Sequence, residues 1–254
     1  MKVALTIAGS DPTGGAGLQV DLKVFNAYGI YGISVPSVLT AQNTKTVLDI
    51  YELPANFFSL QMQGLLQDII PDATKTGMLY DPEIIRITAQ MVRAFDLRHL
   101  VIDPVTVSST GTALIKDKAL ETLKKELFPL AEVITPNIYE ASLLGGIKIE
   151  DEEDMKKAAK ILKDSGAQTV VITGGHLSDR TIDILYDGVE FLRIEGNKMP
   201  GEYHGTGCVY SAALTANLAL GQDIKTAALN AKGVVDKAIM SSLRLGNGLS
   251  LLNL

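Results

Sequence analysis

The sequence is poor in metal-binding and cross-linking side chains: it has one cysteine, Cys208, and three scattered histidines. A single cysteine cannot form an internal disulfide, and the histidines lack the spacing of zinc ligands. A disulfide scaffold and a zinc cluster are therefore excluded, and we expect a cytoplasmic protein. The N-terminal apolar run, residues 3–8, is too short for the core of a signal peptide.

Excess positive charge and long apolar runs are also lacking. Lys and Arg number 23 while Asp and Glu number 29, which gives a net charge of −6. This balance argues against a surface that neutralises nucleic-acid phosphates. The apolar runs are too interrupted for a membrane protein, whereas 46% hydrophobic residues are too many for a disordered chain. We expect a soluble globular protein that binds neither nucleic acid nor membrane.

No repeat or Pro/Ser-rich linker divides the 254 residues, so we expect one domain, 1–254. Short runs rich in Val and Ile alternate with segments of helical periodicity, of which the clearest is the helix at 151–165. An Asp187-Gly188 hairpin joins two further strands, 181–186 and 190–194. This pattern predicts an α/β fold with a mostly parallel sheet, helices on both faces and ligands at the strand ends. The expected parallel strands are 3–8, 33–39, 100–103, 133–135 and 169–173.

The common nucleotide-binding fingerprints are missing, but two glycine-rich turns stand at helix starts. Residues 8–17 follow the first strand, and their glycines either admit a ligand or serve a plain tight turn. Residues 204–208, His-Gly-Thr-Gly-Cys, enter a helix of small residues, and their free N–H groups form an anion-binding nest. Cys208 at this helix start is expected to have a lowered pKa and to act as base or nucleophile, unless it is simply a buried thiol.

Polar residues at other strand ends suggest further site positions. Asp103 ends one strand and faces the same cleft or serves a turn. Asn137 and Glu140 form a capping box, and Glu140 could also approach a metal through water. Gln42 offers a donor and an acceptor side by side, the complement of an aminopyrimidine edge, or it is a solvated loop residue.

Together these motifs strongly resemble the hydroxymethylpyrimidine/phosphomethylpyrimidine kinases of thiamine biosynthesis, in the ribokinase-like superfamily. The resemblance spans nearly the whole chain. It implies a three-layer α/β fold, a homodimer, and the use of ATP and Mg²⁺ to phosphorylate 4-amino-5-hydroxymethyl-2-methylpyrimidine and then its monophosphate. The motifs are AGSDPTGGAGLQVDLK at 8–23, TAQNT at 40–44, KTGML at 75–79, IDPV at 102–105, ITPNIYEA at 134–141 and HGTGC at 204–208.

The resemblance also assigns site residues by position. The anion hole is Gly205, Thr206, Gly207 and Cys208, where many superfamily members carry Asp as the base in place of the cysteine. The pyrimidine pocket is Gly9, Asp21, Gln42, Met78 and Val105. Asp103, Asn137 and Glu140 lie near Mg²⁺ and the phosphates, with no direct protein cage for the metal, and Thr173 and Lys232 lie at the nucleotide.

Two departures from the family pattern keep alternatives open. Lysines that are frequent in the family are absent where Ser109 and Thr173 stand, and each loss bears on the second phosphorylation more than on the first. A pyridoxine/pyridoxal kinase group shares the Thr-Gly-Gly form at 173–175, although it tends to lack Gln42. A non-catalytic pyrimidine-binding protein is the remaining alternative, but binding a neutral ring needs no anion hole.

Overall fold

A nine-stranded sheet forms the centre of the computed structural model, which describes residues 1–108, 111–175 and 180–254. Six neighbouring strands run parallel, and the pairings outside them, one at one edge and two at the other, are antiparallel. The expectation of a mostly parallel sheet is thus confirmed. In order across the sheet the strands are β3 (Val47–Glu52), β2 (Tyr31–Gln42), β1 (Val3–Ser10), β4 (Ala73–Thr76), β5 (Leu100–Ile102), β6 (Val133–Ile134), β7 (Thr169–Ile172), β8 (Arg180–Tyr186) and β9 (Phe191–Asn197).

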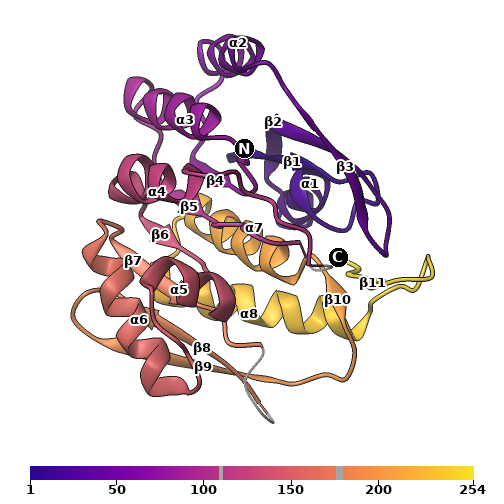
Figure 1. Ribbon diagram of the computed structural model, residues 1–254, viewed down its shortest axis with the longest axis vertical. Helices are drawn as coiled ribbons and strands as arrows, with labels where there is room; N and C mark the ends of the chain where they lie inside the picture. The colour runs from indigo at the N-terminus through magenta and orange to yellow at the C-terminus, as the bar shows by residue number, and fades with distance from the viewer. Residues whose placement is uncertain (109–110, 176–179) are drawn as a thin grey trace.

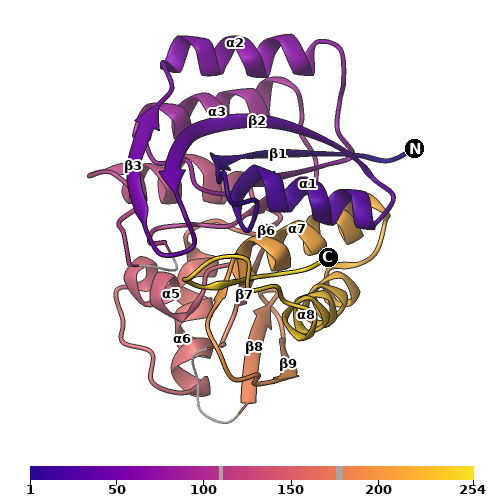
Figure 2. The same ribbon diagram turned by 90° about the vertical axis from the view of Figure 1, so that its right-hand side faces the viewer.

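Helices cover both faces of the sheet (Figures 1 and 2), which confirms the three-layer arrangement. One face carries α1 (Gly17–Ala27), α7 (Thr206–Ala219) and α8 (Ile224–Met240). The other carries α2 (Ala55–Leu66), α3 (Pro82–Ala94), α4 (Ala119–Thr122), the short helical turns η1 (Leu123–Leu127) and η2 (Phe128–Leu130), α5 (Ile138–Gly145) and α6 (Glu152–Asp164). A separate apolar core fills each interface between helices and sheet. Among the described residues, no helix has the length and apolar character needed to cross a bilayer.

The elements with local sequence signals are where the sequence predicts them. Helix α6 begins after Asp151, whose side chain accepts the N–H of Asp154, and it buries Met155 and Leu162. The Asp187-Gly188 hairpin joins β8 and β9 at one edge of the sheet. The five expected parallel strands correspond to β1, β2, β5, β6 and β7.

Four strands had no clear sequence signal: β3, β4, and the small parallel pair β10 (Tyr203–His204) and β11 (Ser250–Leu251). Strand β4 is the most instructive because its sequence, Ala-Thr-Lys-Thr, is largely polar and yet all four residues are buried. Its place between β1 and β5 brings Lys75 into the centre of the molecule. The parallel strands end at a common edge, where the candidate site residues lie.

Candidate active site

The turn before α7 packs against the loop that connects β1 and α1. Gly205 has φ +84°, and a Cβ there would lie 1.9 Å from the carbonyl oxygen of Gly15. Gly17 has φ +58°, and its Cβ would lie 2.2 Å from the carbonyl oxygen of Gly9. Both positions therefore require glycine. The two glycine-rich motifs of the sequence form one structure, with the first turn of α7 at its centre.

The β1–α1 loop is organised around the buried carboxylate of Asp11. This carboxylate accepts hydrogen bonds from the N–H and hydroxyl groups of Thr13, at 2.8 and 2.9 Å, and from the N–H of Ala16, at 2.9 Å. The Nε2 atom of His204 lies 2.8 Å from Asp11 Oδ2. Although burial opposes ionisation, these hydrogen bonds lower the pKa of Asp11 to about 2. An ion pair with His204 thus joins the loop to the turn whenever the imidazole is protonated, and a hydrogen bond does so when it is neutral.

Cys208 lies in the first turn of α7, as expected, but its electrostatic environment is the opposite of the expected one. Burial, together with the charges of Asp103 and Asp21, raises the pKa of the Cys208 thiol to about 12, although Lys75 and a hydrogen bond from the N–H of Gly17 act in the lowering direction. The prediction of a thiolate-favouring site is therefore wrong. Desolvation and two carboxylates outweigh the helix dipole, so Cys208 is a neutral thiol at physiological pH.

A buried ion pair lies beneath this turn. Lys75 Nζ is 2.8 Å from both carboxylate oxygens of Asp21, and Thr6 donates a 2.6 Å hydrogen bond to Asp21 Oδ2. Both charged side chains are fully buried. The negative charges of Asp21 and Asp103 raise the pKa of Lys75 in spite of its burial, so the lysine stays protonated. Asp21, expected in the pyrimidine pocket, presents no surface to a ligand here, because β4 places Lys75 against it.

Asp103 and Glu140 are a second pair of buried acids beside the turn. Asp103 Oδ2 accepts a 2.9 Å hydrogen bond from the hydroxyl of Ser211 in α7, and a Cβ on Gly207 would lie 4.0 Å from the same oxygen. Burial and the charge of Asp103 raise the pKa of Glu140 to about 8. The structure thus brings Asp103 and Glu140 together beside the Gly205 turn, the turn at residues 205–208.

Glu140 also has the structural role that its spacing predicted. Its Oε2 accepts the N–H of Asn137 at 2.9 Å, and the N–H of Glu140 donates to Asn137 Oδ1 at 2.9 Å, so the capping box of α5 is confirmed. The remaining oxygen, Oε1, accepts the N–H of Thr106 at 3.2 Å. Because both oxygens already hold amides, Glu140 suits a metal approached through water better than a direct metal ligand.

A small apolar patch, largely buried, lies next to the β1–α1 loop. Val38, Met78 and Leu114 form a small cluster with Val105 packed against it. A Cβ on Gly9 would lie 3.2 Å from Met78 Sδ and 3.2 Å from Val38 Cγ1, so this glycine brings the backbone of β1 close to the patch. Gln42, at the end of β2, has its Nε2 atom 3.5 Å from His204 Nε2. Of the five residues assigned to the pyrimidine pocket, Gly9, Met78 and Val105 meet directly, and Gln42 lies at the polar border with His204.

The two residues assigned to the nucleotide are linked through Asp183 in β8. Lys232 Nζ lies 3.0 Å from Asp183 Oδ1, which also accepts the N–H of Gly174 at 2.9 Å. Thr173 directly precedes Gly174, so Thr173 and Lys232 belong to one neighbourhood. Lys232 is buried; its ammonium group holds the segment after β7 instead of pointing freely at a ligand. Ser109 and His176 lie outside the described residues.

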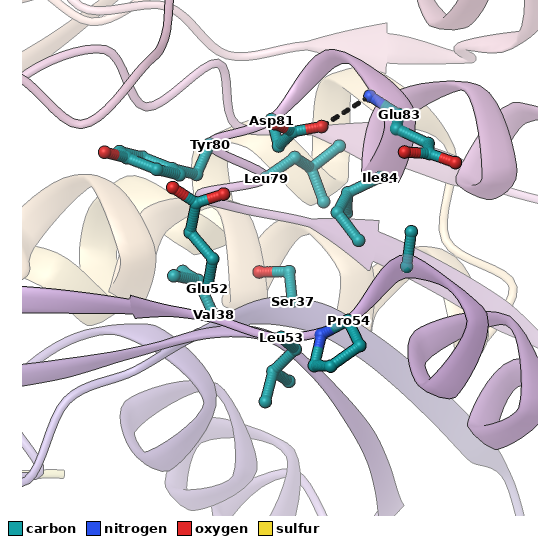
Figure 3. Close-up of a pocket in the computed structure, with 11 residues that line it drawn as sticks. Ser37, Val38, Glu52, Leu53, Pro54, Leu79, Tyr80, Asp81, Glu83 and Ile84 are labelled. Atoms are coloured by element: carbon teal, nitrogen blue, oxygen red, sulfur yellow. Dashed lines mark hydrogen bonds between the residues drawn. The ribbon is translucent and has the colours of Figure 1, made fainter.

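A separate cavity of about 290 Å³, lined in part by Val38, lies between β2, β3 and the starts of α2 and α3 (Figure 3). Glu52 and Asp81 lie on its wall, and Asp81 accepts the N–H of Glu83 at 2.7 Å. Lys116 forms ion pairs with both Glu52 and Asp81. Lys116 thus balances these two carboxylates, and none of the residues around Cys208 lines the cavity.

Comparison with known proteins identifies the family. The family model described as phosphomethylpyrimidine kinase matches residues 11–253. The chain belongs to this family. It is 42% identical to the hydroxymethylpyrimidine/phosphomethylpyrimidine kinase of Synechococcus elongatus, over 98% of this chain and 95% of that protein. It is 43% identical to the thiamine biosynthesis bifunctional protein ThiED of Geobacter sulfurreducens, over 96% of this chain but only half of that protein's length.

The ribokinase-like fold expected for such a kinase is also present in solved relatives. The pyridoxal kinase of Staphylococcus aureus, solved in complex with AMP-PCP and pyridoxal, superimposes on this phosphomethylpyrimidine kinase family member with a TM-score of 0.92. The two chains are 38% identical, and the match covers all of this chain and 93% of the other. The fold is therefore shared with kinases of two different vitamin rings, and only the site residues can distinguish between the substrates.

Sequence reasoning overlooked several residues that the structure places at the site. Asp11, Lys75 and His204 belong to three of the sequence motifs, and the motifs predict no separate role for these side chains. A signal for Lys75 was available in the sequence, because this lysine lies in the KTGML motif, two residues before Gly77-Met78. Ser211 was noted only as a small residue of α7. The partners of these side chains lie 54 to 193 positions away along the chain, so spacing alone could not pair them.

Proposed function

We propose that the protein phosphorylates 4-amino-5-hydroxymethyl-2-methylpyrimidine with ATP and Mg²⁺, and then phosphorylates the monophosphate. The observation that carries this proposal is the close packing of the Gly205 turn on the β1–α1 loop. This contact joins an anion-binding helix start to the apolar patch of Met78 and Val105. A ring held on the patch would have its hydroxymethyl group near the turn.

Catalysis on this site relies on positioning and on charge stabilisation. The N–H groups of Thr206, Gly207 and Cys208 belong to the first turn of α7, so they have no acceptor within the helix and can bind the transferring phosphoryl group. Transfer of a phosphoryl group passes through a loose transition state that places little demand on a strong nucleophile. A neutral Cys208 thiol is consistent with this chemistry. Because a neutral thiol accepts no proton, the proton of the substrate hydroxyl would pass, late in the reaction, to an oxygen of the transferred phosphoryl group.

Mg²⁺ and the nucleotide have suitable partners in the chain. Asp103 and Glu140 provide hard oxygen atoms of the kind that Mg²⁺ prefers, and burial together with the charge of Asp103 raises the pKa of Glu140. These residues would hold the metal through water, and the metal would neutralise the phosphate charge. Thr173 and Lys232, tied together through Asp183, would border the nucleotide.

A pyridoxal kinase is the second candidate, and the likeness to the S. aureus enzyme favours it. Gln42 favours the pyrimidine, because an amide can complement an aminopyrimidine edge. A mass-spectrometric test decides: the purified protein is incubated with MgATP and separately with the pyrimidine alcohol, its monophosphate, pyridoxine and pyridoxal. Conversion of both pyrimidines to the diphosphate supports the proposal. Conversion of only the vitamin B6 compounds contradicts it, and the absence of any product would indicate a binding protein.

We also propose a homodimer in the cytoplasm. Leu48 and Tyr51 on the edge strand β3 and Leu39 on its neighbour β2 are exposed, and such apolar groups at a sheet edge favour association. Sedimentation analysis of wild type and of Leu48→Glu tests the assembly. A monomeric wild type would contradict it.

A further inference from the structure

The amide of Gln42 lies close to two polar side chains, those of His204 and Asp11, to which no role in binding the ring or the phosphate has been assigned. Its Nε2 atom is 3.5 Å from His204 Nε2, and a hydrogen bond from the Gln42 side chain contributes to the lowered pKa of Asp11. His204 Nε2 lies 2.8 Å from Asp11 Oδ2. The three side chains thus form one polar cluster, the Asp11–His204–Gln42 cluster, at the end of β2.

The protonation state of this cluster determines which end of the amide faces it. Asp11, with a pKa of about 2, is ionised and can only accept hydrogen bonds. His204 Nε2 must therefore carry a proton, which it donates to Asp11. If the Gln42 carbonyl oxygen were turned toward the cluster, it would meet the Asp11 carboxylate as a second acceptor. The NH₂ group is the end that Asp11 attracts, so the carbonyl oxygen Oε1 is left for a ligand.

From this geometry we propose that Asp11 and His204 are positioning residues that orient the Gln42 amide, so that its carbonyl oxygen selects a ring bearing an amino donor and rejects a ring bearing an anionic oxygen. The inference rests on the proposed function, because it takes Gln42 as a border of the ring site. The aminopyrimidine carries an exocyclic NH₂ group. Pyridoxal carries a ring hydroxyl that is ionised at neutral pH, since the protonated ring nitrogen withdraws electron density.

The same cluster explains how discrimination can be strong with a single amide. A glutamine free to rotate would present NH₂ to an anionic oxygen and C=O to an amino group, and would accept both rings. An amide held by Asp11 cannot rotate without placing its oxygen against a buried carboxylate. When the Gln42 amide has one imposed orientation, its carbonyl oxygen faces the anionic oxygen of the wrong ring, and two acceptors meet without a proton between them. Such a site is more selective than one whose amide can rotate.

The test is a double-mutant cycle between Asp11→Asn and Gln42→Ala. Asn at position 11 keeps the size of the side chain but can donate as well as accept, so the Gln42 amide becomes free to rotate. We expect the ratio of kcat/KM for the aminopyrimidine alcohol to kcat/KM for pyridoxal to fall about tenfold in Asp11→Asn. In the Gln42→Ala background, Asp11→Asn is expected to leave this ratio unchanged, because the amide that it orients is gone.

Gln19→Ala is the matched control. Gln19 Oε1 accepts the N–H of Asp11 at 2.9 Å, so this variant disturbs the same loop without altering the carboxylate. It is expected to leave the substrate ratio within twofold of the wild type. The proposal is overturned if Asp11→Asn lowers both values of kcat/KM equally, because Asp11 would then only support the loop. It is also overturned if the change in ratio persists without Gln42.

Affinities measured by calorimetry in the absence of ATP keep the two proposals separate. A wild type that phosphorylates pyridoxal but not the aminopyrimidine would contradict the proposed function. The cycle can still be run on the dissociation constants of the two compounds, and an unchanged ratio of affinities in Asp11→Asn would then overturn the inference about the amide.

Discussion

Two buried lysine–aspartate pairs lie on opposite sides of the candidate site, and they differ in what surrounds them. Lys75 and Asp21 lie at the centre of the sheet, fully buried, beneath the first turn of α7. Lys232 and Asp183 lie beside the segment proposed to border the nucleotide, and Lys232 is 8% exposed. Lysine is seldom buried unless it is paired with an acid, so each aspartate is needed to keep its lysine charged inside the protein.

The difference lies in how many groups depend on each lysine. Lys75 interacts with the charges of Asp21 and Asp103, so it balances the two acids beneath the Gly205 turn. Asp183 keeps a second donor, the N–H of Gly174, besides Lys232. We infer that the first pair compensates the buried charges beneath the Gly205 turn, whereas the second pair anchors the loop after β7.

Lys75→Met gives the largest expected effect. Removing the ammonium group leaves buried carboxylates without compensation, and we expect the free energy of unfolding to fall by about 3–5 kcal/mol. Urea denaturation measures this loss. The double variant Lys75→Met/Asp21→Asn should recover part of the stability, since it removes one of the stranded charges. Equal stabilities of Lys75→Met and the wild type would contradict the role assigned to this pair.

Cys208→Ala tests the turn above that pair. We expect kcat to fall about 100-fold while KM for the pyrimidine changes little, because Cys208 belongs to the turn proposed to bind the transferring phosphoryl group and not to the proposed ring pocket. Because the pKa of Cys208 is raised to about 12, the wild-type rate should show no inflection from this thiol between pH 6 and 9 in steady-state assays. An unchanged kcat would remove Cys208 from the mechanism, and Cys208→Ser is the conservative control.

Glu140→Gln tests the acids beside the turn through the pH dependence of stability. Burial and Asp103 raise the pKa of Glu140 from 4.5 to about 8, so the folded protein binds an extra proton between these values. This contribution to stability is fully present below pH 4.5 and is lost as the pH rises through 8. The stability of the wild type should therefore decline more than that of Glu140→Gln between pH 5 and 8. Parallel declines in chemical denaturation would show that Glu140 does not titrate in this range.

The sequence predicts features whose cause is local and misses those whose cause is distant. The capping box of α5 and the periodicity of α6 depend on residues three or four positions apart, and both predicted features are confirmed. Strand β4 escaped prediction because its lysine is stabilised by Asp21, 54 positions earlier. The pKa of Cys208 was predicted from the adjacent helix start alone. Burial and the charge of Asp103, more than 100 positions away, reverse its direction.

Lys232→Met gives the smallest effect and completes the comparison of the two pairs. Asp183 loses the ammonium group but keeps the N–H of Gly174, so we expect a loss of about 2 kcal/mol in the free energy of unfolding, less than for Lys75→Met. Because the loop after β7 borders the proposed nucleotide site, KM for ATP should rise while KM for the pyrimidine stays the same. Lys237→Met, an exposed position on the same helix, is the matched control and should change neither quantity. If Lys232→Met destabilised the protein as much as Lys75→Met does, the two pairs would be equivalent. The distinction between a pair that compensates buried charges and a pair that anchors a loop would then fail.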